Sequence, residues 1–527
     1  GVEQARALGF TVRQPAAPGV EEPGQTAART LWVLPSTAPV GRKGKHFVDF
    51  QNDVTAADLM LATREGYRSI EHVKRYTTTG MGTDQGKTSN VAALAIVAQA
   101  LGVEAPAVGT TTFRAPYTPT TIGAYGGRDV GRLFAPIRTT AMDSWHRAAG
   151  AKFEHVGDWM RAWYYPRAGE SLRQAVDREV TAARSGVAIL DASTLGKIDV
   201  RGADAAEFLN RVYSNAWTRL GVGRCRYGLM LKEDGMVMDD GVTTRLADDH
   251  FHMTTTTGGA ARVLNWLEEY LQTEWPELDV RLTSVTEQWA VASICGPKSR
   301  ALLARLCTDI DLGNDAFPFM AMREGSVAGI PARVFRISFT GELSYEINVP
   351  TRWGLALWEA LIDAGADLGI TPYGTEAMHV LRAEKGFIIV GQDTDGSVTP
   401  SDLGMDWIVG RQKPDFIGKR GMARPDLLKP DRKQFVGLLT QDPAEVLPEG
   451  AQVVEAVKPK PPMAMLGHVT SSYYSPTLGR SIAMALVKGG HARKGQALYV
   501  PLQGRTIAVT VADTTVFYDP EGSRRDG

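Results

Sequence analysis

Two segments of the chain each predict a pair of antiparallel strands followed by a helix, and this pattern constrains the fold most. The first is GVTTRLADDHFHMTT (241–255), with a predicted helix over 261–271. The second is ARVFRISFTGELSYEINV (332–349), where apolar and polar residues alternate, with a predicted helix over 354–365. Because the strands come in hairpins, we predict an α+β fold rather than a run of parallel βαβ units.

The length of 527 residues predicts several domains. Thr55 and Asp58 have the spacing of a helix capping box, and residues 90–101 predict a buried helix. Leu172, Val176 and Val180 follow the helical period. We divide the chain into a leading segment with a linker (1–45), a helical domain (46–112), a linker arm (113–139), a mixed α+β domain (140–430) and a C-terminal β-barrel domain (431–527). The chain opens without a methionine, and we expect it to be the C-terminal part of a longer polypeptide.

The composition excludes several classes of protein. With 58 basic and 59 acidic side chains, the formal net charge of −1 gives no general attraction to nucleic acid or membranes. Cys225, Cys295 and Cys307 form no CxxC pair, which excludes a disulfide scaffold and a cysteine-bound iron–sulfur cluster. The longest apolar stretch, 91–101, is too short to cross a bilayer. We expect a cytoplasmic location and no metal site.

Two other patterns carry no catalytic motif. GMGTDQGKTSN (80–90) has Met81 where a P-loop needs glycine, so we expect a turn that meets a partner or a ligand. His250 and His252 lie on one face of a predicted strand. Without a third ligand nearby, we expect both histidines to be ordinary surface residues.

Acidic residues in predicted strands are the first candidates for a functional site. Asp239 and Asp240 are neighbours, so their side chains point to opposite faces, and one can face a cavity while the other faces solvent. A carboxylate in a cavity can accept a proton or stabilise an iminium cation. Glu346 can accept two adjacent N–H donors in a fork. The alternatives are a solvated turn for the aspartates and a solvent-facing position for Glu346.

Three further residues are weaker candidates. Arg382 lies with Glu384 and Lys385 near the end of a predicted helix, where charge pairing is the alternative. Tyr227 and Trp407 can flank a planar ring, although most such side chains belong to the core or its rim.

Six sequence blocks, in the same order, resemble the glycine cleavage T-proteins, the folate-dependent aminomethyltransferases. They are LDASTLGKIDVRG (190–202), DGMVMDDGV (234–242), FTGELSYEI (339–347), YGTEAMHVLRAEKG (373–386), DFIGKR (415–420) and SSYYSPTLGRSIAMALV (471–487). Two further blocks, HFVDFQNDVT (46–55) and RYTTTGMGTDQGKTSN (75–90), extend the resemblance to the alpha subunits of heterotetrameric sarcosine oxidases.

The resemblance implies a three-part T-protein-like fold that ends in a β-barrel and holds folate in a central cavity. It places Asp240 beside folate N10, with Asp239 as its neighbour, and Glu346 on the pterin edge. It also implies that Tyr227, Arg382 and Trp407 line the pocket. Phe339 stands where the family often has tyrosine, so a polar contact of that hydroxyl is lost.

The resemblance also implies a reaction shared between subunits. A flavin in the beta subunit oxidises sarcosine to an imine, and oxygen takes the electrons as hydrogen peroxide. Tetrahydrofolate bound to this chain then captures the imine carbon, which gives glycine and 5,10-methylenetetrahydrofolate. The implied complex contains beta, gamma and delta subunits, FMN at the beta-subunit interface, FAD, and NAD in an upstream dinucleotide-binding domain absent from these 527 residues.

Three alternatives stay open from the sequence. The chain can be a free-standing aminomethyltransferase that takes its carbon unit from a lipoyl carrier. It can be a scaffold that only holds flavin subunits together. It can also have the same architecture but serve another N-methyl amino acid or another electron acceptor.

Overall fold

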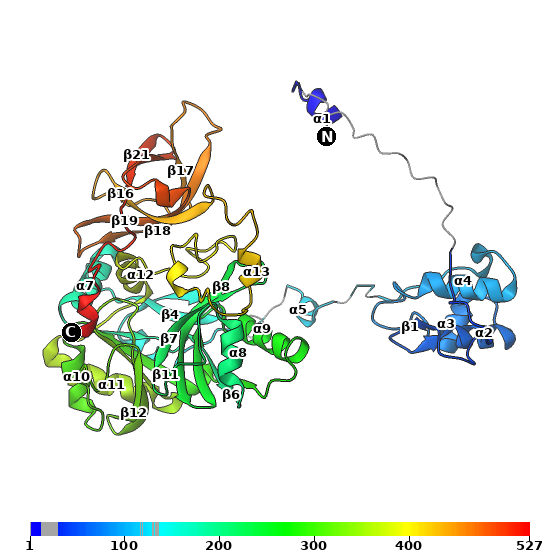
Figure 1. The fold of residues 1–527 in the computed structure, drawn as a ribbon, viewed down its shortest axis with the longest axis horizontal. Coiled ribbons are helices and arrows are strands. Elements are labelled where there is room, and N and C mark those ends of the chain that lie inside the picture. Colours follow the sequence, from blue (N-terminus) through cyan, green and yellow to red (C-terminus); the bar gives the residue numbers. More distant parts are fainter. Residues whose placement is uncertain (1, 12–29, 116, 119, 129–130, 132–135) are drawn as a thin grey trace. The chain divides into compact units, whose positions relative to one another are not determined.

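The structure, a computed structural model, divides the chain into two compact units, Gly1–Phe134 and Ala135–Gly527 (Figure 1). It describes residues 2–11, 30–115, 117–118, 120–128, 131 and 136–527. Parts of the linkers expected within 1–45 and 113–139 therefore lie outside the described residues. Within the described ranges, no helix is long and apolar enough to cross a membrane.

The first unit is a small helical domain. The helices α2 (Ala56–Arg64), α3 (Ile70–Thr77) and α4 (Asn90–Leu101) enclose a core that includes Leu59, Val73 and Ile96. The predicted capping box is confirmed, because Thr55 and Asp58 bond each other's backbone N–H groups at the start of α2. Its other elements are α1 (Val2–Ala7), β1 (Phe47–Asp49), β2 (Val54–Thr55), η1 (Ala105–Val108) and α5 (Ile122–Tyr125).

The second unit contains two large sheets, each covered by helices on one face. The first sheet has the strand order β10 (Arg281–Ser284), β6 (Gly196–Arg201), β9 (His250–Thr255), β8 (Val237–Ala247) and β7 (Cys225–Leu231). Helices α8 (Ala205–Val212) and α9 (Ala260–Thr273) cover its apolar face, where Ile198 and Val200 of β6 meet Phe208 and Val263. Since side chains alternate along a strand, the polar residues of β6 point to the opposite face.

The second sheet follows the same rule. Its strand order is β12 (Ala321–Val327), β13 (Ile330–Arg336), β14 (Ser344–Pro350), β11 (Trp289–Cys295), β5 (Ala188–Asp191) and β15 (Thr371–Pro372). Helices α10 (Ser299–Leu306) and α11 (Gly354–Ala364) pack on the face that carries Ile347 and Val349 of β14. Glu346 and Asn348 therefore lie on the other face of β14.

A closed barrel completes the fold. Its strands run in the order β16 (Lys433–Thr440), β19 (Arg480–Lys488), β18 (Met465–Ser475), β17 (Gln452–Val454), β20 (Ala497–Leu502) and β21 (Arg505–Val511). Helices α7 (Leu172–Ser185) and α12 (Thr375–Glu384) share a core with β19, through residues such as Val180, Leu381 and Met484. The shorter elements of the second unit are α6 (Asp143–Ala148), β3 (Lys152–Val156), β4 (Trp159–Tyr164), η2 (Thr286–Gln288), η3 (Thr351–Trp353), η4 (Ala366–Leu368), η5 (Asp406–Ile408), α13 (Lys419–Met422), η6 (Gly490–Ala492) and η7 (Ser523–Asp526).

The predicted α+β class and the C-terminal barrel are confirmed. Both predicted hairpins form, as β8 pairs antiparallel with β9 and β13 with β14. The helices predicted over 261–271 and 354–365 are α9 and α11. Both hairpins carry polar residues on the faces that the helices leave uncovered.

Candidate functional site

A cavity lined by both polar and apolar side chains lies between the uncovered faces of the two sheets. It encloses about 330 Å³ of space, its open mouth included. Most of the lining side chains come from the two sheets: Lys197, Val242, Thr244, His252 and Thr254 from the first, and Val291, Phe335, Glu346 and Asn348 from the second. Ala192, Leu195 and Ile337 line it from the loops beside these strands. Its hydrogen-bonding and charged side chains converge on one space, as they do in sites that orient a small organic ligand.

Glu346 is the acidic group of this cavity. Burial raises the pKa of its carboxyl to about 7, and the nearby Lys197 acts in the opposite direction. No side chain or N–H group of the described residues donates a hydrogen bond to this carboxylate, although it is largely surrounded by protein. Glu346 is half-buried and lines the cavity, so its oxygens are open to accept N–H donors from a ligand.

Lys197 is the cationic group of the same cavity. Its Nζ donates hydrogen bonds to the carbonyl oxygens of Ser193 and Leu195, at 2.8 and 2.9 Å. Burial lowers the pKa of this amine to about 8, and Glu346 raises it again. The ammonium therefore has fixed partners in the wall, and its field favours the ionised form of Glu346.

Asp240 and Tyr227 form a hydrogen-bonded pair on the face of the first sheet that also lines the cavity. The Tyr227 hydroxyl donates to Asp240 Oδ2 at 2.7 Å. Asp240 shares its face of β8 with Val242 and Thr244, which line the cavity. Burial raises the pKa of Asp240 to about 7, while the Tyr227 hydrogen bond opposes this shift. A carboxyl with such a pKa exchanges protons readily near neutral pH.

Asp239 is held by hydrogen bonds inside the protein. The expectation that one of the two aspartates faces solvent is wrong. Its side chain is fully buried and accepts hydrogen bonds from the backbone and hydroxyl of Thr256, at 3.1 and 2.9 Å. Gly259 lies so close that a Cβ there would stand 1.8 Å from Asp239 Oδ2. Asp239 thus fixes the turn between β9 and α9, and the two neighbours do lie on opposite faces as predicted.

The two histidines of β9 are also buried more deeply than the sequence predicted. His252 is 2% exposed, and its Nδ1 lies 2.8 Å from Asp199 Oδ1. His250 Nε2 lies 3.0 Å from the other oxygen of Asp199. The expectation that they are surface residues is wrong, because the polar face of this strand meets the second sheet instead of solvent.

Arg382 lies away from the cavity lining. It is fully buried on α12, where it is paired with Asp393, donates to the Phe387 carbonyl at 2.9 Å and to the Ser471 hydroxyl at 2.7 Å. Ser471 belongs to barrel strand β18, so Arg382 joins the body of the second unit to the barrel. Its role as a ligand contact stays a prediction.

Two predicted aromatic residues lie at the surface. Phe339 is 39% exposed and stacks on Phe387, with ring centroids 6.1 Å apart. Trp407 is 73% exposed in η5. The structure therefore brings together Tyr227 and Asp240 and places Glu346 in the cavity, while these aromatic residues stay predictions as ligand contacts.

Sequence reasoning missed Lys197, His252 and Asn348 as cavity residues. Lys197 begins the alternation KIDVR of β6, in which Ile198 and Val200 are the apolar members. The only signal in the sequence was a lysine within a largely apolar strand. The sequence of a polar strand face is the same whether that face meets water or a cavity.

Family models match three consecutive parts of the chain. Residues 43–128 match the sarcosine oxidase A3 domain, residues 142–413 the GCVT N-terminal domain, and residues 433–519 the glycine cleavage T-protein C-terminal barrel domain. The resemblance predicted from the sequence is confirmed.

Individual relatives support the same assignment. The sarcosine oxidase subunit alpha of Corynebacterium sp. (strain P-1) is 56% identical over 95% of this chain and 52% of its own length. That of Rhizobium meliloti is 46% identical over 95% of this chain and 51% of its length, so the chain spans about half the length of these relatives.

The aminomethyltransferase of Streptomyces avermitilis is 33% identical over 68% of this chain and 92% of that protein. The solved glycine cleavage system aminomethyltransferase T from Bartonella henselae has a TM-score of 0.63 and 26% identity, covering 72% of this chain and 98% of that one.

Proposed function

The chain belongs to the glycine cleavage T-protein family, and on that premise we propose that its cavity binds tetrahydrofolate and transfers a one-carbon unit to it. One observation carries the proposal: the Glu346 carboxylate, without a donor from the described residues, lines the cavity between the two sheets. Asp240, bonded to Tyr227, lies on the same face of β8 as the lining residue Val242. Glu346 has two oxygen acceptors for the adjacent N–H groups of a pterin. Lys197 helps to keep this carboxyl ionised.

Asp240 is the proposed proton acceptor of the transfer. Tetrahydrofolate N5 bonds to the imine carbon, the bond from that carbon to the glycine nitrogen breaks, and N10 closes the ring. The protons lost by N5 and N10 balance those gained by the glycine nitrogen. A carboxyl with a pKa of about 7 can take the N10 proton and release it again. Its ionised form also stabilises the cationic intermediate.

The sarcosine oxidase relatives, half of whose length the chain spans, support a proposal for the wider activity. We propose that a partner beta subunit oxidises sarcosine and supplies the imine, within a complex that also has gamma and delta subunits. FMN at the beta-subunit interface, FAD, and NAD in an upstream domain are proposed for that complex, and no residue of this chain is assigned to them. The identity of 46% or more to two named sarcosine oxidase subunits supports this substrate over other N-methyl amino acids.

The free-standing aminomethyltransferase is the second candidate, favoured by the match to 92% of the Streptomyces avermitilis protein. The match of residues 43–128 to the sarcosine oxidase A3 domain supports the first candidate instead. Purification of the full-length protein distinguishes them, because only the first predicts a yellow flavoprotein complex.

Substitution Asp240→Asn tests the proposal in the full-length complex. We expect sarcosine-dependent peroxide to persist while 5,10-methylenetetrahydrofolate falls at least about tenfold, because a general base contributes this much or more. Uncaptured imine hydrolyses, so free formaldehyde should rise. Asp249→Asn, in the exposed turn between β8 and β9, is the matched control. Unchanged methylenetetrahydrofolate in the Asp240 variant would contradict the assignment.

A further inference from the structure

The loop that connects β13 to β14 borders the cavity. Ile337, at its start, lines the cavity, and Glu346 and Asn348 follow its end on β14. Phe339 lies at the exposed tip and stacks on Phe387. The position of this loop, residues 337–343, therefore affects both the cavity wall and the direction in which β14 presents Glu346.

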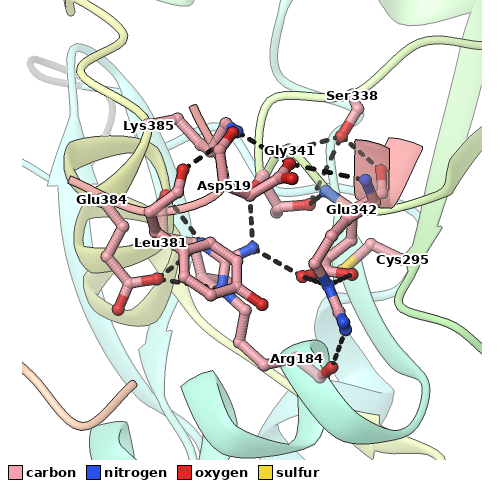
Figure 2. Close-up of polar contacts among 12 residues, drawn as sticks. Arg184, Cys295, Ser338, Gly341, Glu342, Leu381, Glu384, Lys385 and Asp519 are labelled. Carbon is pink, nitrogen blue, oxygen red and sulfur yellow. Dashed lines mark hydrogen bonds and ion pairs between the residues drawn. The ribbon is translucent and has the colours of Figure 1, made fainter. Parts of the chain in front are cut away.

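Arg184 of α7 holds the loop from inside the protein (Figure 2). Its Nη1 donates to the Thr340 carbonyl at 2.7 Å and to Glu342 Oε1 at 3.0 Å. Its Nη2 donates to Glu384 Oε2 of α12 at 2.6 Å. All three charged side chains are at most 7% exposed, so this pairing operates with little screening by solvent.

The segment after the barrel, Phe517–Arg524, returns to the same loop. Arg524 Nε lies 2.9 and 3.0 Å from the two carboxylate oxygens of Glu342. The backbone pairs as well, since the N–H of Leu343 donates to the Arg524 carbonyl at 3.0 Å. Glu342 is 1% exposed, so Arg524 supplies the second cation of a buried carboxylate.

A second anchor holds the same segment to α12. The N–H groups of Phe517 and Tyr518 both donate to the Glu384 carbonyl at 2.9 Å, and Lys385 Nζ lies 3.1 Å from Asp519 Oδ2. Figure 2 places Lys385 and Asp519 close to Gly341. Gly341 has φ +80°, and a Cβ there would stand 2.5 Å from Lys385 Cδ. The loop thus packs directly against the side chain that binds the returning segment.

From these contacts we infer that the returning segment Phe517–Arg524 is a positioning element of the cavity, and that Arg524 acts on the ligand through Glu342 and the 337–343 loop. The inference rests on the proposed function for the identity of the ligand. The family match of the barrel ends at residue 519, so Arg524 lies beyond it.

Substitution Arg524→Met in the full-length protein tests the inference, with Arg525→Met as control. The Arg525 guanidinium lies over the ring of Phe319 instead of Glu342. We expect faster hydrogen–deuterium exchange in the peptide that covers 337–344, and tetrahydrofolate bound about three- to tenfold more weakly, as expected for the loss of one charge-assisted hydrogen bond. The control should leave both quantities unchanged.

Unchanged exchange in the loop would overturn the inference, and so would faster exchange with unchanged tetrahydrofolate affinity. If Arg524→Met does not fold, Arg524→Lys keeps the charge with fewer hydrogen bonds and should give a smaller effect of the same sign. In a double-mutant cycle with Glu342→Gln, the two losses of affinity should be less than additive, because both act on one contact. Additive losses of affinity would contradict the inference that Arg524 acts on the ligand through Glu342.

The loop measurement separates this inference from the proposed function. If the unaltered protein does not bind tetrahydrofolate, the proposed function fails, while hydrogen exchange still decides whether Arg524 holds the loop. If the protein binds tetrahydrofolate and Arg524→Met changes neither quantity, only the positioning role fails.

Discussion

The Tyr227 hydroxyl donates a 2.7 Å hydrogen bond to Asp240 Oδ2, although the two residues lie on adjacent strands and 13 positions apart. Burial and the neighbouring Asp239 raise the pKa of Asp240, while this hydrogen bond lowers it. The pair therefore sets the pH range in which Asp240 is ionised and can accept a proton.

Substitution Tyr227→Phe should raise the pKa of Asp240, because the ionised form loses a donor. The acidic limb of methylenetetrahydrofolate formation should then move to higher pH. At neutral pH the rate should fall about three- to tenfold and recover as the pH rises. Pre-steady-state product assays across this range measure the effect, with Tyr499→Phe in β20 as control. A uniform loss at every pH would indicate that Tyr227 acts in another way.

Substitution Glu346→Gln should weaken tetrahydrofolate binding about ten- to a hundredfold, because one acceptor becomes a donor and the charge is lost. Fluorescence titration of the full-length protein measures the dissociation constant. Glu359→Gln on the exposed face of α11 is the matched control. Equal affinity in the Glu346 variant would exclude its role on the pterin edge.

Lys197→Met should make tetrahydrofolate binding more sensitive to acid. The pKa of Glu346 is raised to about 7, so its carboxylate is lost as the pH falls through that value. Without the Lys197 charge the pKa rises further, and the loss of affinity begins at higher pH. Titrations at several pH values, compared with the exposed control Lys232→Met, give the midpoint. A midpoint that does not move would show that Lys197 has only a packing role.

Arg382→Met should destabilise the protein rather than remove a ligand contact. The change leaves the fully buried Asp393 without its cation, which costs about 3–5 kcal/mol in the free energy of unfolding. Urea denaturation should detect a lower midpoint, whereas the exposed pair of Arg411 with Asp406 allows Arg411→Met as a control with a cost of about 1 kcal/mol or less. If the variant has normal stability but binds tetrahydrofolate more weakly, Arg382 contacts the ligand after all.

The sequence was sufficient for the elements whose signal is local. The hairpin that carries Glu346 was predicted because apolar residues alternate with polar ones, and α2 was predicted from its capping pair. The environments of the polar faces were not predictable in this way. His252 and Lys197 lie on the polar faces of the neighbouring strands β9 and β6, and only the second sheet, distant in sequence, encloses these faces.

Arg382 and Asp239 illustrate the same limit at the level of single contacts. The sequence placed Arg382 near a helix end, but its partners Asp393 and Ser471 come from a loop and from the barrel. Asp239 is fixed by Thr256, in the turn after the next strand. Such pairings depend on the tertiary arrangement, so the type of residue alone could not separate a ligand contact from an internal one.

The position of the cavity between two sheets has a consequence for folding. Its opposite walls come from β6 and β14, which are far apart in the sequence, so closing that loop of chain costs entropy before any wall contact forms. Contacts of such high sequence separation form slowly. During refolding, secondary structure should therefore return before the ligand site does. The rate at which ligand affinity recovers would then report the rate at which the second unit completes its assembly.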